Sequence, residues 1–415
     1  MGHSGIAITD HECISNAIRA QRHYKKIKKE HPDFKLILGN EIYLCRNGLT
    51  KDNYTKGQDS FWHFILLAKD AEGHKQIREI SSRAWLRGWK HGKMKRVPTY
   101  YQDLIDIIDN NKGHVMASTA CLGGYVPHLI LENKIEEAKK WLRQMECLFG
   151  EGNFYLELQP PATSTNEQAV VNKKLVELSK ELDIPYIIST DTHYLKKEDA
   201  FIHKAYLNSQ DGEREVDSFY ATTYLMSTDE LEEYFEYNQE ILQPAYETIQ
   251  GIFDSCEDYD LTKPLRIPEL TWKIFNPKTN LSSWYNKIPQ LQKFVESDYH
   301  GDLRLAQAIV ERVESDETLQ NERTYAAIDE CLDMTWQSSI INNTHWSAYY
   351  LNLQNIIDIC WDAGSLVGAG RGSGVGFILL YILGITQINP LRETTPTFSW
   401  RLEFNGLLCM ATYLK

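Results

Sequence analysis

Residues 184–210 read "IPYIISTDTHYLKKEDAFIHKAYLNSQ". The run 184–190 has the short apolar character of a buried strand, whereas 198–210 has the spacing of apolar residues that is typical of a helix. Asp191 and His193 follow the strand directly, and residues two apart point to the same side of an extended segment. Because ligands of parallel α/β folds lie at the C-terminal ends of strands, the stretch predicts a strand–helix unit with a site at its strand end.

The same order of strand and helix recurs through the first 210 residues. Six segments are predicted as strands: 4–10, 34–44, 61–69, 113–119, 153–159 and 184–190. Six are predicted as helices: 13–30, 71–86, 100–110, 134–150, 166–182 and 198–210. Such repetition predicts parallel connections and either a barrel or an open sheet. The first strand begins at Ser4, and since a barrel of this kind has seven or eight strands, we expect one strand–helix unit to be missing before it.

Side chains that bind transition metals stand on or just after five of these strands. They are His11, Glu41, His63, Cys121, Asp191 and His193. Taken singly, each has an ordinary explanation as a helix cap, a surface histidine or a buried thiol. Their equivalent positions in one repeating pattern predict a shared metal site instead. His203, on the helix that follows, is a candidate to support one of the ligands.

A second unusual stretch, "GSLVGAGRGSGVGFILLYILGIT", covers residues 364–386. Five of its glycines alternate with other residues between two apolar segments, which favours a tight turn over a flexible linker. We expect the turn to bind phosphate, with Ser373 beginning a helix that runs to Gly384. The alternative is a packing role for the glycines, with Arg371 buried and Ser373 as a helix cap, because the stretch matches neither the GxGxxG nor the Walker pattern.

Composition limits the class of protein. The 415 residues carry a net charge of -13, whereas a protein that only coats nucleic acid is basic. Two basic stretches, 23–31 and 83–96, are interpreted first as solvated faces, although the second interleaves Trp85 and Trp89 with Arg and Lys. No apolar run is long enough to cross a membrane. Eight scattered cysteines without a CxxC pair, and no secretory signal, predict the cytoplasm.

The pattern changes after about residue 220, where acidic helical segments begin, and two prolines in 260–272 mark a junction. We therefore expect a first domain at 1–260, a linker at 261–280 and a second domain at 281–415, mostly helical before the glycine stretch.

Several motifs together resemble a known family. "GHSGIAITDHECISNAIRA", "ILGNEIYL", "HFILLAKDAEGHKQIREISSRAW", "STACLGGYVP", "FYLELQ" and "STDTHYLKKEDAFIHKAYL" resemble, in order, the PHP domain of the C-family replicative DNA polymerases, the alpha subunits of bacterial and phage DNA polymerase III. "SAYYLNLQNIIDICWDAGSLVGAGRGSGVGFILLYILGITQINPL" resembles the start of that family's palm, including its GRGS turn. The resemblance runs through nearly the whole chain.

The resemblance implies an α/β fold: a distorted PHP-type β/α barrel with one strand missing, then a mostly helical segment and the beginning of a nucleotidyltransferase-like palm. It implies that the six side chains above are metal ligands. In some members this site supports a 3′–5′ exonuclease or phosphoesterase activity, and in others it is structural. The implied metals are Zn²⁺ or Mn²⁺ in the PHP site and Mg²⁺ for polymerisation.

The resemblance also implies that Arg371, Gly372 and Ser373 lie on the phosphates of an incoming nucleotide. The implied partners are a DNA primer-template, deoxynucleoside triphosphates and replisome subunits such as a sliding clamp, with no membrane.

Two departures qualify these expectations. The family's first motif, HxH, is expected before Met1, and no aspartate follows Asp362. Since phosphoryl transfer onto a primer needs carboxylates for two metals, Glu393 and Glu403 are poor substitutes. We therefore expect an internal part of a polymerase that does not itself extend primers and that binds one transition metal weakly, with little hydrolysis. The alternatives are a free-standing metal-dependent phosphoesterase and a non-catalytic scaffold.

Overall fold

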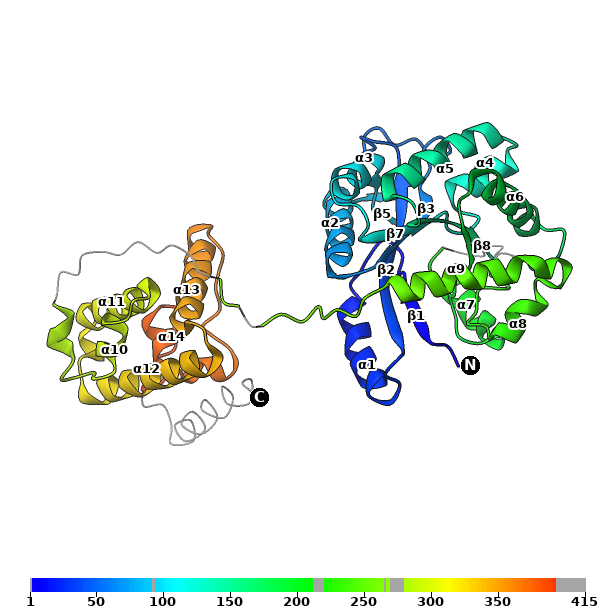
Figure 1. The fold of residues 1–415 in the computed structure, drawn as a ribbon. Coiled ribbons are helices and arrows are strands. Elements are labelled where there is room, and N and C mark those ends of the chain that lie inside the picture. Colours follow the sequence, from blue (N-terminus) through cyan, green and yellow to red (C-terminus); the bar gives the residue numbers. More distant parts are fainter. Residues whose placement is uncertain (1, 92–93, 212–219, 265, 269–279, 393–415) are drawn as a thin grey trace. The chain divides into compact units, whose positions relative to one another are not determined.

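The computed structural model describes residues 2–91, 94–211, 220–264, 266–268 and 280–392. The chain divides into two compact units, Met1–Lys263 and Pro264–Lys415, shown in Figure 1. The domain limits expected from the sequence stay predictions. Within the described ranges, no helix has the combination of length and apolar character that crossing a membrane requires.

The first unit alternates strands and helices. Its strands are β1 Gly5–Ile8, β2 Lys35–Cys45, β3 Trp62–Ala68, β4 Trp89–His91, β5 Met94–Arg96, β6 Thr99–Tyr100, β7 Val115–Ser118, β8 Phe154–Leu158 and β9 Tyr186–Ile188. Its α-helices are α1 Ala17–Glu30, α2 Ala71–Arg87, α3 Tyr101–Leu104, α4 Tyr125–Leu131, α5 Ile135–Phe149, α6 Glu167–Leu182, α7 Ala200–Asp211, α8 Thr228–Glu233 and α9 Leu242–Ser255. A π-helical turn at Ile105–Asp109 and 3₁₀ turns at Lys197–Asp199 and Glu236–Ile241 complete it. All six predicted strands are present, and the short strands β4, β5 and β6 were not predicted.

The main sheet has seven strands in the order β1-β2-β3-β7-β8-β9, with β6 paired to β2. Its pairs are parallel except at β3, which runs antiparallel to both β2 and β7. The expectation of parallel connections throughout is therefore wrong at β3. A parallel return needs a long crossover, usually a helix. Residues 46–61, which join β2 to β3, contain no helix, so the chain turns back beside β2 instead.

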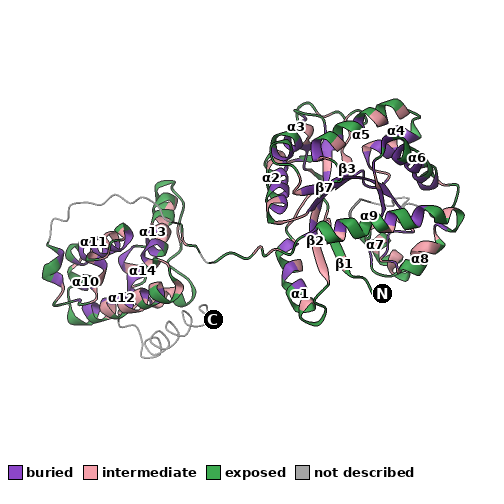
Figure 2. Cartoon of the chain, viewed as in Figure 1, coloured by how far each residue is buried: buried purple, intermediate pink, exposed green. Residues whose placement is uncertain are grey.

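The register gives the sheet two faces, because alternate residues of a strand point to opposite sides. One face is apolar apart from Asn40 and packs against α2, α4, α5 and α6, which supply most of the remaining residues of the largest hydrophobic cluster. Leu66, Phe154 and Leu156 on this face are essentially inaccessible to solvent. Figure 2 accordingly shows buried strands at the centre, with the flanking helices buried on the sides that face them.

The opposite face of the sheet changes character along the strands. At one end it is apolar, where Ile37, Met116 and Ile187 form a smaller buried cluster with Ile252 of α9, the helix that crosses this face in Figure 1. Further along, the same register places Glu41 in one row with Ser118, and His63 and Glu157 beyond that row. Helix α9 thus covers the apolar end of this face and does not cover the polar end, where a functional site can form.

The second unit is helical. It contains α10 Leu291–Val295, α11 His300–Ser315, α12 Glu322–Asn342, α13 Trp346–Asp362 and α14 Ile378–Ile382, with 3₁₀ turns at Leu281–Trp284, Glu317–Leu319 and Gly372–Gly376. Its core is one cluster to which α11, α12 and α14 contribute most, with Leu305, Ile309 and Ile328 fully buried. The mostly helical character predicted for this region is confirmed in its described part.

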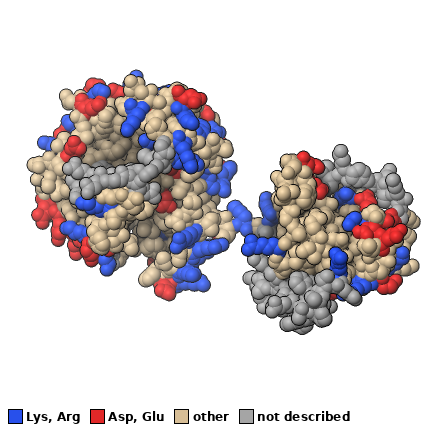
Figure 3. All heavy atoms as spheres, turned by 180° about the vertical axis from the view of Figure 1, so that it is seen from behind, with Lys and Arg blue, Asp and Glu red and all other residues tan. Residues whose placement is uncertain are grey.

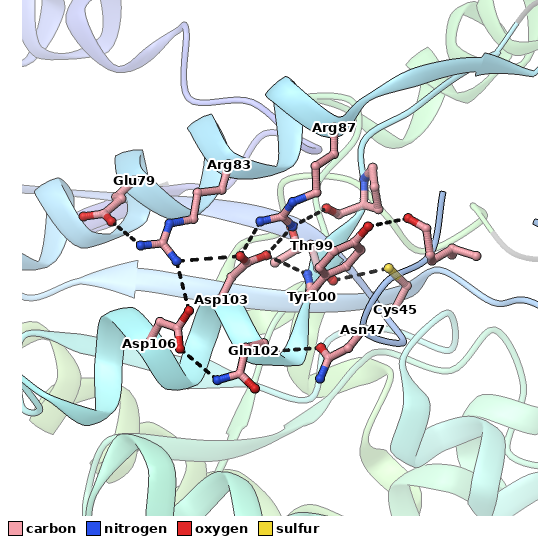
Figure 4. A network of polar contacts seen from close by, with 12 residues as sticks. Cys45, Asn47, Glu79, Arg83, Arg87, Thr99, Tyr100, Gln102, Asp103 and Asp106 are labelled. Atoms are coloured by element: carbon pink, nitrogen blue, oxygen red, sulfur yellow. Dashed lines mark hydrogen bonds and ion pairs between the residues drawn. The ribbon is translucent and has the colours of Figure 1, made fainter. Parts of the chain in front are cut away.

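A buried ion pair fixes the end of α2 against α3. Arg87 donates two hydrogen bonds to the buried carboxylate of Asp103, which also accepts from the backbone N–H of Tyr100. Arg83, one turn earlier on α2, pairs with Glu79 and Asp106. Figure 4 shows these contacts as one network. Both arginines are therefore used to hold α2 in place, although they belong to a stretch that the sequence marks as basic.

Candidate metal centre

The polar end of the sheet gathers the predicted ligands from separate strands. The chain continues beside β2 after β1 ends, because the backbone N–H of Glu41 donates to Asp10 and that of Glu12 donates to Glu41, at 3.1 and 2.7 Å. This pairing brings His11 next to Glu41. His63 lies near the start of β3, and because β3 is antiparallel its start lies beside the C-terminal part of β2.

His11, Glu41 and His63 form a compact group. The two carboxylate oxygens of Glu41 divide between the histidines: Oε1 lies 2.6 Å from Nδ1 of His63, and Oε2 lies 3.5 Å from Nδ1 of His11. One ligand atom from each residue lies within 4.8 Å of the other two. The Glu41 side chain is 4% exposed and that of His11 is 41% exposed, so the group opens toward solvent on the His11 side.

The other three predicted residues surround this group, and we call the six residues together the rim. Each of the three contacts a neighbour in the rim. Nε2 of His193 lies 3.4 Å from Nε2 of His11, and Nδ1 of His193 lies 3.7 Å from Oδ1 of Asp191. The Sγ atom of Cys121 lies 3.3 Å from Nδ1 of His63. The structure therefore brings all six into one region, with three in the compact group and three around it. Their role as metal ligands stays a prediction.

Glycine allows the approach of the Cys121 turn to His63. A Cβ atom on Gly123 would lie 3.0 to 3.1 Å from three atoms of the His63 ring, and one on Gly124 would lie 2.2 Å from the carbonyl oxygen of Thr119. The "ACLGG" sequence thus permits a close contact that larger residues would block.

The electrostatics of the rim favour a cation. Burial alone would raise the pKa of Glu41, but the hydrogen bond with His63 and the charges of the nearby histidines lower it below the usual value. Burial raises the pKa of Asp191 to about 7, and the negative charge of Glu41 adds to this effect. Burial also lowers the pKa of His11, which favours the neutral imidazole that binds metals.

Four further residues complete the surroundings, and the sequence pointed to only one of them. The Tyr43 hydroxyl lies 3.3 Å from Nδ1 of His11, and the ring centroid of His203 lies 5.3 Å from that of His193. The supporting role of His203 stays a prediction. Burial raises the pKa of Glu12 to about 7 beside this rim. Glu157 lies buried deeper on the same face. Tyr43 could have been found because it lies two residues after Glu41 on the same strand and so points to the same face. Glu157 could have been found because it is a charged residue within an otherwise apolar strand.

The residues present fit a divalent transition metal. Imidazole nitrogen and carboxylate oxygen are the donors that Zn²⁺ and Mn²⁺ use, and a central carboxylate shared between two imidazoles supplies negative charge where a cation would bind. His11, Glu41 and His63 are the residues that would hold such an ion first. Asp191 and His193 lie beside this group and could supply further ligands to the metal ion.

The glycine stretch of the second unit differs from its prediction. A 3₁₀ turn covers Gly372–Gly376, the backbone is extended at Phe377, and α14 then has only five residues. The expected helix from Ser373 to Gly384 is therefore wrong, and the phosphate argument from its dipole is lost. Gly374 and Gly376 lie inside the expected range and have a low helix propensity, and the extended backbone at Phe377 separates the 3₁₀ turn from α14.

Arg371, Gly372 and Ser373 lie exposed at this turn, so the alternative in which Arg371 is buried does not hold. Glu393 and Glu403, weighed as substitutes for catalytic aspartates, lie outside the described residues.

Comparisons with known proteins agree with the two-part organisation. The model of the PHP domain matches residues 1–161, and that of the bacterial DNA polymerase III alpha NTPase domain matches residues 304–406. The probable DNA polymerase YorL of Bacillus subtilis is 37% identical over 97% of this chain and 33% of its own length. The DNA polymerase III subunit alpha of Borreliella burgdorferi is 30% identical over 94% of this chain and 30% of its own length.

The chain thus spans about a third of the length of these curated relatives. The match covers both units in the same order as in the relatives. The chain is therefore related to the bacterial and phage DNA polymerase III alpha subunits, with a PHP domain at residues 1–161 followed by part of their NTPase domain.

Proposed function

We propose that this chain serves template-directed DNA synthesis through two separate sites. The compact group of His11, Glu41 and His63 binds a divalent transition metal, Mn²⁺ or Zn²⁺, and slowly hydrolyses phosphate esters at the 3′ end of DNA. The glycine turn of the second unit contacts the phosphates of a deoxynucleoside triphosphate. The meeting of two imidazoles on one buried carboxylate is the observation that carries the first site.

A bound metal would supply Lewis-acid activation of a phosphate ester. The chain's own residues do the rest. Glu41 holds the two imidazole rings, and Cys121 packs against the His63 ring. Burial raises the pKa of Tyr43, so it remains a neutral hydroxyl that orients His11. The exposed side of His11 leaves an approach for a substrate.

Metal-dependent hydrolysis tests this proposal. The purified chain should release nucleotides from a labelled single-stranded oligonucleotide in the presence of Mn²⁺, stop when EDTA is added, and resume when Mn²⁺ is restored. It should also cleave bis(4-nitrophenyl) phosphate, which needs only the metal site. A chain that binds Mn²⁺ and hydrolyses neither substrate would contradict the catalytic role and favour a scaffold.

Arg371→Ala should weaken binding of a deoxynucleoside triphosphate by about 10-fold at low ionic strength, since a charge-assisted contact to phosphate is lost. Isothermal titration would measure the affinity, and inorganic phosphate should compete because the turn recognises charge. Arg392→Ala removes an exposed arginine from the same unit and serves as the control. Equal losses in both variants would contradict a specific role for Arg371.

The wider activity is proposed from the relatives, whose names describe DNA polymerases. Primer-template DNA and deoxynucleoside triphosphates are the proposed substrates, with Mg²⁺ as the metal of polymerisation. A sliding clamp is a further proposed partner.

A further inference from the structure

The basic stretch at 83–96 is not a uniform solvated face. Its two arginines on α2, Arg83 and Arg87, form ion pairs with Asp106 and Asp103 in the network of Figure 4. After α2 ends, the chain forms a two-stranded ribbon, β4 and β5, in which Lys90 and Lys95 are directly opposite each other. Both lysines are exposed, and in the described part of the chain neither takes part in an ion pair.

Two like charges directly opposite across an antiparallel pair destabilise it. A two-stranded ribbon also has little stability of its own. Because the pairing of Lys90 with Lys95 opposes folding of the ribbon, it indicates that the two lysines have a role other than stability. The stretch therefore concentrates positive charge on one face of the ribbon, in a chain whose net charge is -13.

The ribbon is connected to the candidate metal site through Trp85 and Glu12. The ammonium group of Lys95 lies 3.8 Å from the centre of the Trp85 ring, a cation–π contact that fixes its place. The indole N–H of Trp85 donates to the carbonyl oxygen of Glu12 at 2.7 Å. The N–H of Glu12 in turn donates to the carbonyl oxygen of Glu41. Three contacts thus lead from Lys95 to Glu41 in the candidate site.

On the face drawn in Figure 3, many Lys and Arg side chains of the first unit gather along one side. Positive charge gathered in this way attracts a polyanion such as the backbone of a nucleic acid.

We propose that Lys90 and Lys95 form a docking surface for the phosphate backbone of single-stranded nucleic acid, whose end then reaches the His11, Glu41 and His63 group. This inference rests on the proposed hydrolysis for its purpose, but its evidence is separate. Contacts to the backbone give affinity without sequence preference and depend strongly on salt.

Binding of a fluorescent oligo-deoxythymidine in EDTA, followed by anisotropy over a range of KCl concentrations, tests the surface. Lys90→Gln/Lys95→Gln should reduce affinity at low salt by about 10-fold and lower the slope of log affinity against log salt by about 1.4, or about 0.7 for each lost contact. Lys26→Gln/Lys29→Gln makes the same change in net charge on exposed positions of α1, in the other basic stretch, and should alter binding little.

Hydrolysis of bis(4-nitrophenyl) phosphate separates the two proposals, because that substrate is too small to span the ribbon and the rim. Its rate should be unchanged in the ribbon variant. If the chain hydrolyses nothing but loses oligonucleotide binding only in the ribbon variant, the docking surface stands and the hydrolysis fails. Equal weakening in both lysine pairs, or no change in the ribbon variant, overturns the docking surface whatever the hydrolysis shows. Circular dichroism should show both variants folded, since the ribbon variant removes a repulsion.

Discussion

Glu41→Gln should reduce the affinity of the chain for Mn²⁺ by about 100-fold or more. Changes to residues that only support a metal ligand cost about 10- to 100-fold in affinity, and Glu41 is placed to be the ligand itself. Its two oxygens face His63 and His11, so a single substitution removes the negative charge shared by both. Glutamine keeps the size of the side chain and one carbonyl oxygen, which limits the change to charge and donor strength.

Titration of the metal-free protein with Mn²⁺, followed by electron paramagnetic resonance, would measure this affinity. Asp10→Asn is the matched control, since it removes one negative charge from the residue next to His11 without removing a predicted ligand. An equal loss in both variants would mean that Glu41 acts only through the general negative potential. Unchanged affinity in Glu41→Gln would remove the metal centre from this rim altogether.

The sequence was most informative where one periodicity dominates. Strands such as β3 and β8 are mostly apolar runs, interrupted only by His63 and Glu157, and helices such as α5 and α6 have clear amphipathic spacing, so their existence was predictable. The direction of β3 was not, because it depends on how the loop 46–61 returns, and no local pattern records that. The pair β4 and β5 was missed for a similar reason, since strands of three residues carry too little pattern.

The candidate site was predictable because its chemistry repeats. His11, Cys121, Asp191 and His193 follow parallel strands, which deliver them to one edge of the sheet, whereas Glu41 lies within β2 and His63 near the start of β3. What could not be predicted is which three residues form the compact group, because the antiparallel course of β3 decides how close His63 comes to Glu41. In the glycine stretch, by contrast, the sequence pattern predicted an element that is not there, the helix from Ser373 to Gly384. A run of apolar residues suggested a long helix, but the extended backbone at Phe377 leaves only the five residues of α14.

Glu157 gives rise to the second large effect, on stability. It is buried beneath the rim and accepts hydrogen bonds from Ser118, from Ser189 at 2.6 Å and from Gln159 at 3.1 Å, all neutral donors. Burial raises the pKa of Glu157, since a carboxylate here gives up hydration without a cation in return. Glu157→Gln should therefore increase the free energy of unfolding of the metal-free chain at neutral pH by about 1–3 kcal/mol, because the amide needs no charge in that place.

The sign of the pH dependence follows from proton binding. Above the unfolded pKa of about 4.3, the native state holds the Glu157 proton more tightly than the unfolded state does, so this group's stabilising contribution is lost as pH rises through the raised native pKa. Glutamine does not titrate, and the advantage of the variant should thus be small near about pH 4 and grow toward about pH 8.

Urea unfolding in EDTA over this pH range would measure the free energy of unfolding of the wild type and of Glu157→Gln. Asp191 and the other titrating groups are present in both proteins, so their effects cancel in the difference. Glu151→Gln, at an exposed position just before β8, should show no such trend. Bound Mn²⁺ should shrink the advantage, because a cation in the rim stabilises the ionised carboxylate below it. A wild-type chain that is more stable than Glu157→Gln at about pH 8 without metal would contradict the prediction, because the fold would then compensate the charge of the carboxylate without a cation.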